Sequence, residues 1–227
     1  MNIAILGNGK MGKKISCLAL KKGYKIVCIA DSKNPIESLD LSVADVAIDF
    51  STPNTAFNNI THAINSNIPV ISGTTAWLDK LQDIHKLCEL KGGAFLYSSN
   101  FSLGANILFE LNKKLAKLMK NQNYQQNIEE THHTQKIDTP SGTAITLAKQ
   151  IEKTLKKTTE IISNRTNNIA GTHLITYKSK IDEIEIKHTA NNRDGFAIGA
   201  IIAAKWIIGK KGIYSMKDVL KEEKIII

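Results

Sequence analysis

Short apolar runs alternate with longer amphipathic stretches through the first half of the chain. Strands are predicted at 2–6, 24–30, 44–50, 68–72 and 94–98. Helices are predicted from the turn at 7–12 to about 22, from 51 to about 65, and over 76–90. Short apolar strands that alternate with helices are typical of right-handed βαβ units, so a parallel α/β sheet is expected here.

The pattern changes after Ser102. Helices are predicted over 103–119, from Ser141 to about 156, and over 194–207. A strand leads into 129–133, and the segments 173–178 and 183–188 alternate with period two, as half-buried strands do. We therefore expect a second, α+β domain with an open sheet from residue 103, and a short helix start in the tail 212–220.

A glycine-rich turn follows the first strand and opens the first helix. Its residues are Gly7, Asn8, Gly9, Lys10, Met11 and Gly12, which fit G-x-G-x-x-G. In such a turn the first glycine permits the tight bend, the second admits a pyrophosphate, and the third lets helix and strand pack closely. Asp31 ends the second strand about 20 residues on, where a carboxylate accepts hydrogen bonds from ribose hydroxyls. The motif predicts a dinucleotide site, with a purely structural turn as the alternative.

Two further loops stand at the ends of predicted strands, where open α/β sheets bind ligands. They are Phe50-Ser51-Thr52-Pro53 and Gly73-Thr74-Thr75-Ala76. Helix capping explains both loops without a ligand, and it is certainly part of the explanation for Ser51 and Thr52. The second loop is a candidate contact for the nicotinamide half of the dinucleotide.

A second polar motif lies in the second domain, from Glu130 to Ala144. It gathers His132, His133, Lys136 and the helix start Ser141-Gly142-Thr143. The N–H groups of Gly142 and Thr143 would point at an anion, and Lys136 and a protonated histidine would add positive charge. The motif predicts a receptor for a carboxylate or phosphate with a proton donor beside it. Solvated surface histidines are the alternative.

Metal and disulfide sites are not expected. His132 and His133 are neighbours on a strand and point to opposite faces, and the chain has no H-x-x-x-H pair or matching cysteine set. Its three cysteines, Cys17, Cys28 and Cys88, form no C-x-x-C pair. This cysteine usage suits a reducing cytoplasm.

Composition argues against two classes of partner. The 227 residues carry 30 lysines and arginines against 21 acidic residues, but only Arg165 and Arg193 are arginine. Nucleic-acid binders favour arginine for base contacts and aromatics for stacking, and aromatics make up only 6% of this chain. No run of about 18 apolar residues is present, and the N-terminus does not resemble a signal peptide. Neither a nucleic acid nor a membrane is expected as a partner.

Several motifs occur in one order along the chain. They are the glycine turn, Gly73-Thr74-Thr75, Asn100-Phe101-Ser102, His132-His133-x-x-Lys136-x-Asp138-x-Pro140-Ser141-Gly142-Thr143-Ala144, Arg165, Gly171-x-His173, Glu185-Ile186-x-His188, Arg193-x-x-Phe196-Ala197-x-Gly199-Ala200, Trp206 and Tyr214-Ser215-Met216-x-Asp218-Val219-Leu220. In this order they resemble the 4-hydroxy-tetrahydrodipicolinate reductase (dihydrodipicolinate reductase) family of diaminopimelate and lysine biosynthesis. The chain departs from that family in a short 32–43 region, in Ala76 where glycine is common, and in Arg165-Thr166-Asn167 where Arg-x-Gly is usual.

The resemblance implies the fold, the assembly and the reaction. A Rossmann domain over 1–102, to which 207–227 return, would bind the dinucleotide. A substrate-binding domain over 103–206, with an open mixed sheet, would build a homotetramer. The enzyme would reduce a cyclic dicarboxylate, the condensation product of pyruvate and aspartate semialdehyde, with NADH or NADPH.

The resemblance also implies residue roles. His132 would be the proton donor, and Lys136 its partner as acid or electrostatic stabiliser. The substrate contacts would be His133, Lys136, Ser141, Gly142 and Thr143. The cofactor contacts would be Gly7–Gly12, Asp31, Gly73, Thr74, Thr75, Ser99, Asn100, Phe101 and Ser102.

The residues around Asp31 bear on the choice of cofactor. Asp31 favours free ribose hydroxyls and repels a 2′-phosphate, whereas Lys10 and Lys33 are close enough in sequence to reach a phosphate. Ser32 stands where some family members have arginine. Because lysine holds a phosphate less firmly than the arginine fork does, a modest preference for NADH over NADPH is expected.

Two functions of other classes stay as alternatives. One is an NAD(H)-binding module without catalysis, and the other is a basic nucleic-acid-binding protein, which the scarcity of arginine disfavours. A third alternative, within enzymes, is a different Rossmann reductase acting on another small dicarboxylate. The block from His132 to Thr143 argues against the first, because a cofactor sensor has no need of it.

Overall fold

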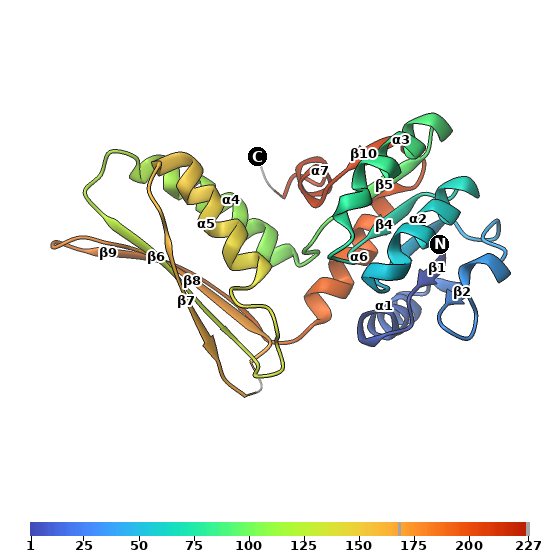
Figure 1. Cartoon of the computed structure of the whole chain (residues 1–227), viewed down its shortest axis with the longest axis horizontal. Coiled ribbons are helices and arrows are strands. Elements are labelled where there is room, and N and C mark those ends of the chain that lie inside the picture. Colours follow the sequence, from blue (N-terminus) through green and yellow to red (C-terminus); the bar gives the residue numbers. More distant parts are fainter. Residues whose placement is uncertain (168, 226–227) are drawn as a thin grey trace. The chain divides into compact units, whose positions relative to one another are not determined.

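The chain forms two compact units. The computed structural model describes residues 1–167 and 169–225. Asn168, Ile226 and Ile227 lie outside the described residues. Ile226 and Ile227 belong to the segment 207–227, which is expected to return to the first domain. One unit comprises Met1–Ser102 with the chain from Phe196 onward, and the other comprises Leu103–Gly195 (Figure 1). No described helix combines the length and hydrophobicity that a membrane span requires.

A six-stranded sheet forms the centre of the first unit, in the order β10-β5-β4-β3-β1-β2. Its strands are β1 (Asn2–Leu6), β2 (Lys25–Ala30), β3 (Val46–Asp49), β4 (Val70–Ser72), β5 (Ala94–Tyr97) and β10 (Gly212–Tyr214). All neighbouring strands are parallel. Because β1 pairs with both β2 and β3, the direction in which the sheet is built reverses at β1. Open α/β sheets bind ligands at such a reversal.

Helices cover both faces of this sheet, which explains why its strands are continuous apolar runs. The elements are α1 (Lys10–Lys21), η1 (Ile36–Ser38), α2 (Pro53–Asn65), η2 (Leu78–Lys80), α3 (Leu81–Lys91), α6 (Asp194–Ile207) and α7 (Met216–Glu222). On one face, Ile60 of α2 and Ile84 of α3 pack in the same core as Leu6. On the other face, Gly12 of α1 approaches the side chain of Ile5.

The first unit differs from the predicted elements in two places. The tail contains a strand, β10, in addition to the predicted helix start, and its three residues are too few to show periodicity. The helix predicted from Ala76 begins at Leu81 instead. Ala76 has a left-handed backbone with φ 60°, and the indole N–H of Trp77 donates to the carbonyl oxygen of Thr74. The turn therefore continues where a helix was expected.

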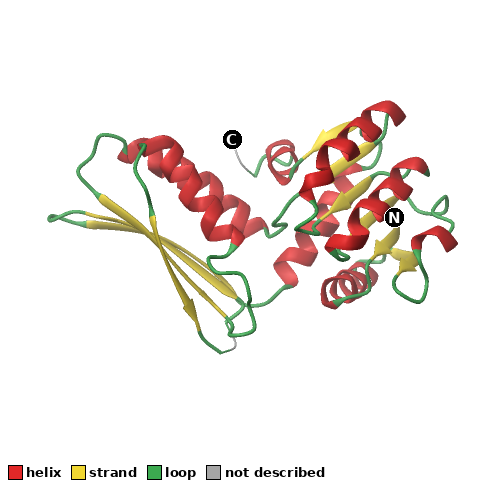
Figure 2. Ribbon diagram, in the orientation of Figure 1, coloured by secondary structure: helices red, strands yellow, loops and turns green. Residues whose placement is uncertain are grey.

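The second unit is a four-stranded mixed sheet in the order β7-β6-β8-β9. Its strands are β6 (Gln125–His132), β7 (Glu160–Arg165), β8 (Gly171–Lys178) and β9 (Glu183–Ala190). β6 is parallel to β7 and antiparallel to β8, and β8 is antiparallel to β9. The helices α4 (Leu103–Met119) and α5 (Gly142–Leu155) lie together over one face (Figure 2). Leu147, Ile128 and Tyr177 are buried between helices and sheet.

The predicted fold class, a Rossmann-like parallel sheet with an open mixed second sheet, is confirmed. One strand of the second sheet, β7, was not predicted. Its sequence does not alternate cleanly, since Ile161 and Ile162 are adjacent. Its register with β6 places Ile161 opposite Ile128 and Arg165 opposite His132. This unpredicted strand therefore brings an arginine to the histidine motif.

Candidate active site

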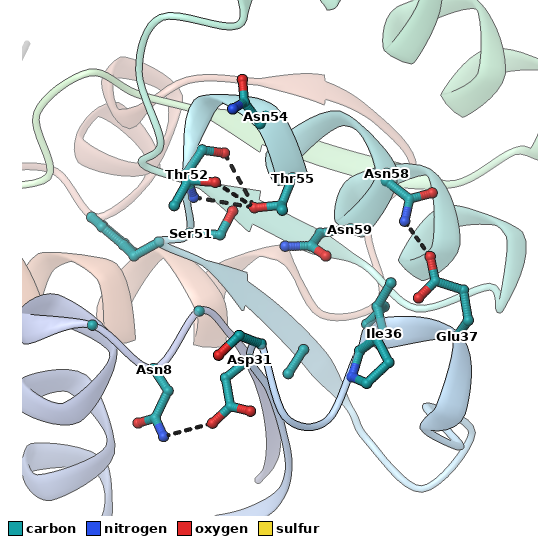
Figure 3. Close-up of a pocket in the computed structure, with 16 residues that line it drawn as sticks. Asn8, Asp31, Ile36, Glu37, Ser51, Thr52, Asn54, Thr55, Asn58 and Asn59 are labelled. Atoms are coloured by element: carbon teal, nitrogen blue, oxygen red, sulfur yellow. Dashed lines mark hydrogen bonds between the residues drawn. The ribbon is translucent and has the colours of Figure 1, made fainter.

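A pocket of about 630 Å³ opens in the first unit where the strand order reverses (Figure 3). Gly7, Asn8 and Gly9 line it from the turn after β1. Asp31 lines it after β2, and Ser51 after β3. The pocket thus lies at the carboxyl ends of three adjacent strands, the position at which this topology binds nucleotides.

The three glycines of the turn meet different steric demands. A Cβ on Gly7 would lie 2.3 Å from the carbonyl oxygen of Phe50, and one on Gly12 would lie 1.9 Å from that of Gly7. A Cβ on Gly9 would meet no atom within 4 Å, so this residue faces open space at the start of α1. These are the properties that a dinucleotide turn requires: a tight bend, an approach for phosphate and close packing of the helix.

Asn8 and Asp31 are hydrogen-bonded to each other at the edge of the pocket (Figure 3). The Asn8 amide donates to one carboxylate oxygen of Asp31 at 3.0 Å, and the backbone N–H groups of Lys33 and Asn34 donate to the other. The hydrogen bond from Asn8, followed by those from the backbone, holds the pKa of Asp31 below its ordinary value. The pocket therefore carries a fixed negative charge at neutral pH.

The opposite wall of the pocket consists largely of residues that the sequence analysis did not assign. Thr52 and Thr55 form a capping box at the start of α2, with Pro53 at its first position. Asn58 of α2 donates to the carboxylate of Glu37 in η1 (Figure 3). The loop before α2 was recognisable from its place at a strand end, whereas η1 belongs to the short 32–43 region, which shows no motif.

A buried carboxylate joins the two loops at the ends of β3 and β4. Asp49 accepts hydrogen bonds from the hydroxyls of Ser51 at 2.6 Å and of Ser72 and Thr74 at 2.7 Å. Thr74 in turn accepts from the backbone N–H of Ser51 at 2.9 Å. Burial raises the pKa of Asp49, although these hydroxyl donors oppose that effect. The Thr74 hydroxyl therefore has a structural role within the unit: its hydrogen bonds hold the loop 50–53 beside the loop 73–76.

The other residues predicted to contact the cofactor do not line this pocket. Lys10, Met11 and Gly12 belong to α1, and the remaining residues follow β4 and β5: Gly73, Thr74, Thr75, Ser99, Asn100, Phe101 and Ser102. The side chain of Phe101 is 1% exposed and packs against Phe50, with ring centroids 5.5 Å apart. Lys10, Thr75 and Ser99 are the exposed members. Their role as cofactor contacts stays a prediction.

In the second unit, His132 lies among polar side chains from three strands. It ends β6 and is 7% exposed. Arg165 of β7 lies opposite His132 in the strand register. The ring of His173 on β8 lies 5.1 Å from the His132 ring, centroid to centroid. A Cβ on Gly171 would come within 3.0 Å of the His132 ring, so glycine leaves room for the imidazole. The register of the sheet assembles this group.

Glu130 precedes His132 on the same face of β6 and is completely buried. One oxygen of its carboxylate, Oε1, accepts from the backbone N–H of Ser141 at 3.0 Å and from the hydroxyl of Ser163 at 2.9 Å. The guanidinium of Arg165 lies 3.3 Å from the same oxygen. Burial disfavours the charged form of Glu130, but these donors outweigh it and hold its pKa below the ordinary value.

Burial controls the titration of the neighbouring histidines. It lowers the pKa of His132, and the negative charge of Glu130 opposes this shift. Burial, reinforced by the charge of His132, lowers the pKa of His173 to about 4. His173 is therefore neutral at neutral pH.

The predicted anion receptor lies at the start of α5. Ser141 is the N-cap, and its hydroxyl accepts from the backbone N–H of Ala144 at 3.2 Å. A Cβ on Gly142 would meet no atom within 4 Å, so the helix start is open on that side. Lys136 is ion-paired with Asp138 at 2.7 Å in the preceding loop, and His133 is half-buried. A helix start with a nearby cation suits a carboxylate.

The second unit contains a candidate metal-binding group that no continuous sequence motif shows. Within the described ranges, the group whose ligand atoms lie close enough together for an ion, within 4.8 Å of one another, consists of Glu130, His132 and His173. In the sequence only His132 and His133 stand together, because His173 comes from a distant strand. The positive charges of Lys136 and Arg165 act on this group and disfavour a divalent cation. The expectation of no metal stays a prediction.

Comparison with protein families matches both units. The model of the dihydrodipicolinate reductase N-terminus matches residues 1–101, and that of its C-terminus matches residues 104–220. This chain belongs to the dihydrodipicolinate reductase family. Membership confirms the resemblance noted in the sequence, the reductase class and a pyridine-nucleotide cofactor, NADH or NADPH.

Individual relatives of this reductase cover nearly its whole length. The 4-hydroxy-tetrahydrodipicolinate reductase of Christiangramia forsetii is 48% identical and covers 98% of each chain. That of Thermosipho africanus is 37% identical, with 98% of this chain and 99% of the other covered. A solved structure of dipicolinate-bound dihydrodipicolinate reductase from Paenisporosarcina sp. TG-14 has a TM-score of 0.82 at 22% identity, covering 97% of this chain and 99% of that one. This last likeness bears on the fold.

Proposed function

We propose that this chain reduces 4-hydroxy-tetrahydrodipicolinate to tetrahydrodipicolinate in diaminopimelate and lysine biosynthesis, with His132 as the proton donor. The observation that carries the proposal is the second unit's open helix start at Ser141, beside the buried group of His132 and Glu130. Curated relatives that carry this reductase name cover almost the whole chain. The dicarboxylate substrate supplies the anionic groups that such a helix start attracts.

The residues of the first unit fit a nicotinamide dinucleotide. The turn Gly7–Gly12 offers backbone N–H groups at the start of α1, and Asp31 and Glu37 are acceptors for ribose hydroxyls in the same pocket. Loss of the 4-hydroxyl group of the substrate as water gives an unsaturated ring, and the nicotinamide, when bound, supplies a hydride to that ring. Thr75 and Ser99 are the exposed residues proposed to contact the nicotinamide half.

The second unit would hold the substrate and complete the reduction. The start of α5 at Ser141, Gly142 and Thr143 binds carboxylate groups, with His133 and Lys136 adding polar contacts. Reduction increases electron density at the ring nitrogen, and a proton has to arrive there. Protonated His132, assisted by the charge of Lys136, stabilises this density and donates the proton.

Coupled turnover tests the proposed reaction. Pyruvate, aspartate semialdehyde and the upstream synthase generate the cyclic substrate in the presence of NADH and this chain. We expect NADH absorbance to fall only in the complete mixture. Omission of the synthase is the control, and unchanged absorbance in the complete mixture contradicts the proposal.

Pyridine-2,6-dicarboxylate is expected to inhibit competitively against the cyclic substrate. It is a planar dicarboxylate of similar shape, and the fold relative from Paenisporosarcina was solved with dipicolinate bound. Its affinity should fall as salt rises, because charge-assisted contacts are screened. Initial rates at several inhibitor, substrate and salt concentrations measure both effects. Competition with NADH alone would place the inhibitor in the first unit and contradict this assignment.

A modest preference for NADH is expected from the charge of the cofactor pocket. Asp31→Ala should lower kcat/KM for NADH by about tenfold, through loss of ribose hydrogen bonds, and should favour NADPH in relative terms. Lys33→Ala should weaken NADPH selectively. Values of kcat/KM for both cofactors, with Lys21→Ala at the far end of α1 as control, measure these effects. A strong parental preference for NADPH that Lys33→Ala leaves unchanged would contradict this interpretation.

The second sheet also supports a proposal about assembly. Both α4 and α5 cover the same face of the sheet (Figure 2). Ile162, which neighbours Glu129 in the strand register, is 40% exposed. We infer that this sheet joins four copies into a homotetramer, and light scattering of the purified protein measures the mass.

The free cysteines Cys17, Cys28 and Cys88 suit the proposed cytoplasmic location.

A further inference from the structure

The two oxygens of the Glu130 carboxylate face different parts of the second unit. Oε1 takes the hydrogen bonds from Ser141 and Ser163. Oε2 lies 3.4 Å from Nδ1 of His132 and 3.8 Å from Nε2 of His173. One buried carboxylate thus contacts both the start of α5 and the proposed proton donor.

Oε2 of Glu130 and Nδ1 of His132 both need a partner. Each is buried and has no hydrogen bond in the described structure. A buried polar atom without a partner is unfavourable, so a pair of such atoms 3.4 Å apart gains from becoming donor and acceptor. Catalytic hydrogen bonds are often long before substrate binds and shorten afterwards.

We propose that Glu130 is a positioning residue, whose Oε2 accepts the Nδ1–H of His132 while its Oε1 holds the first residue of the anion-binding helix start. The proposal rests on the proposed function for its kinetic consequences. It assigns the Nδ1–H tautomer to neutral His132 and leaves Nε2 as the nitrogen that takes up and donates the catalytic proton. Nε2 is the ring atom nearest to the space that glycine leaves at position 171.

The charge of Glu130 acts on His132 together with several other groups. Lys136 and Asp138 face His132 from the loop after β6, Arg165 from β7 and His173 from β8. Behind His173, the ring of His188 on β9 stacks at 6.5 Å. Without the negative charge of Glu130, repulsion from the cations Lys136 and Arg165 would be offset less, so protonated His132 would become less stable.

The test compares Glu130→Gln with Glu129→Gln. Both variants replace a carboxylate by an amide of the same shape, but Glu129 lies on the opposite face of β6 and accepts from Asn164 at 2.8 Å. We expect Glu130→Gln to lower kcat by about 10–100-fold, as loss of such supporting contacts does. The proton donor must be protonated, so the rate falls as pH rises through its pKa. In Glu130→Gln this decline should move to lower pH by about one unit or more.

Glu129→Gln should keep the parental rate and pH profile. A purely structural role for Glu130 would loosen the start of α5, raise KM for the substrate and leave the pH of the decline unchanged. Folded Glu130→Gln with an unmoved pH profile therefore overturns the proposal.

Nitrogen-15 NMR of the imidazole rings tests the proposal without substrate or variant. The parental spectrum should show neutral His132 as the Nδ1–H tautomer, and the opposite tautomer overturns the positioning role even if Glu130→Gln does not fold. This measurement is independent of turnover, so it separates failure of the inference from failure of the proposed function. Absence of reductase activity in the parental protein would indicate failure of the proposed function.

Discussion

His132→Gln and Lys136→Met are each expected to lower kcat by about 10²-fold or more, the usual consequence of losing a general acid. His132 lies 3.4 Å from the carboxylate of Glu130, and Lys136 adds a positive charge that acts on it. Rates of NADH oxidation with the cyclic substrate measure the loss. The affinity for NADH, measured by fluorescence titration, should change little because the Gly7–Gly12 turn belongs to the other unit.

Matched substitutions elsewhere control for side-chain type. His85→Gln changes a histidine of α3, and Lys117→Met changes an exposed lysine of α4. Both should turn over at the parental rate. Near-parental turnover of folded His132→Gln and Lys136→Met would remove both residues from the proposed proton transfer.

Gly12→Ala is expected to damage the dinucleotide turn itself. Its new Cβ would lie 1.9 Å from the carbonyl oxygen of Gly7, a backbone atom that cannot move without shifting the turn. We expect the free energy of unfolding to fall by about 1–3 kcal/mol and NADH affinity to fall by more than about tenfold. Chemical denaturation and calorimetric titration with NADH measure these two effects.

Two other glycines separate stability from cofactor binding. Gly9→Ala places its Cβ in open space, so this variant should keep the parental stability and lose NADH affinity. Gly93→Ala makes only ordinary contacts, the nearest at 3.5 Å, and should keep both. Parental NADH affinity in Gly12→Ala and Gly9→Ala would show that the turn does not hold the dinucleotide.

The first unit could be predicted almost completely, since apolar residues make up most of each long parallel strand. What the sequence pattern missed depends on contacts between distant segments. β10 has three residues and is a strand only because it pairs with β5. β7 owes its existence to pairing with β6, since its own residues do not alternate. The delayed start of α3 depends on the contact between Trp77 and Thr74.

The two candidate sites were predictable to the extent that they lie in continuous motifs. The glycine turn and the block from His132 to Thr143 are local, and spacing alone indicated their chemistry. Glu130 lies two residues before that block, and its contacts depend on strand pairing that brings in Arg165 and His173. Asp49 has no motif around it, and its role comes from hydroxyl groups on two separate loops.

Transfer of a single deuterium tests the proposed reaction most directly. The upstream synthase forms the cyclic substrate from pyruvate and aspartate semialdehyde, and this chain is added with NADH carrying two deuterium atoms at C4 of the nicotinamide. We predict that mass spectrometry of the product finds one ring deuterium for each NADH oxidised. Oxidation of the deuterated NADH without deuterium in the product, or no oxidation at all, would contradict the proposed function.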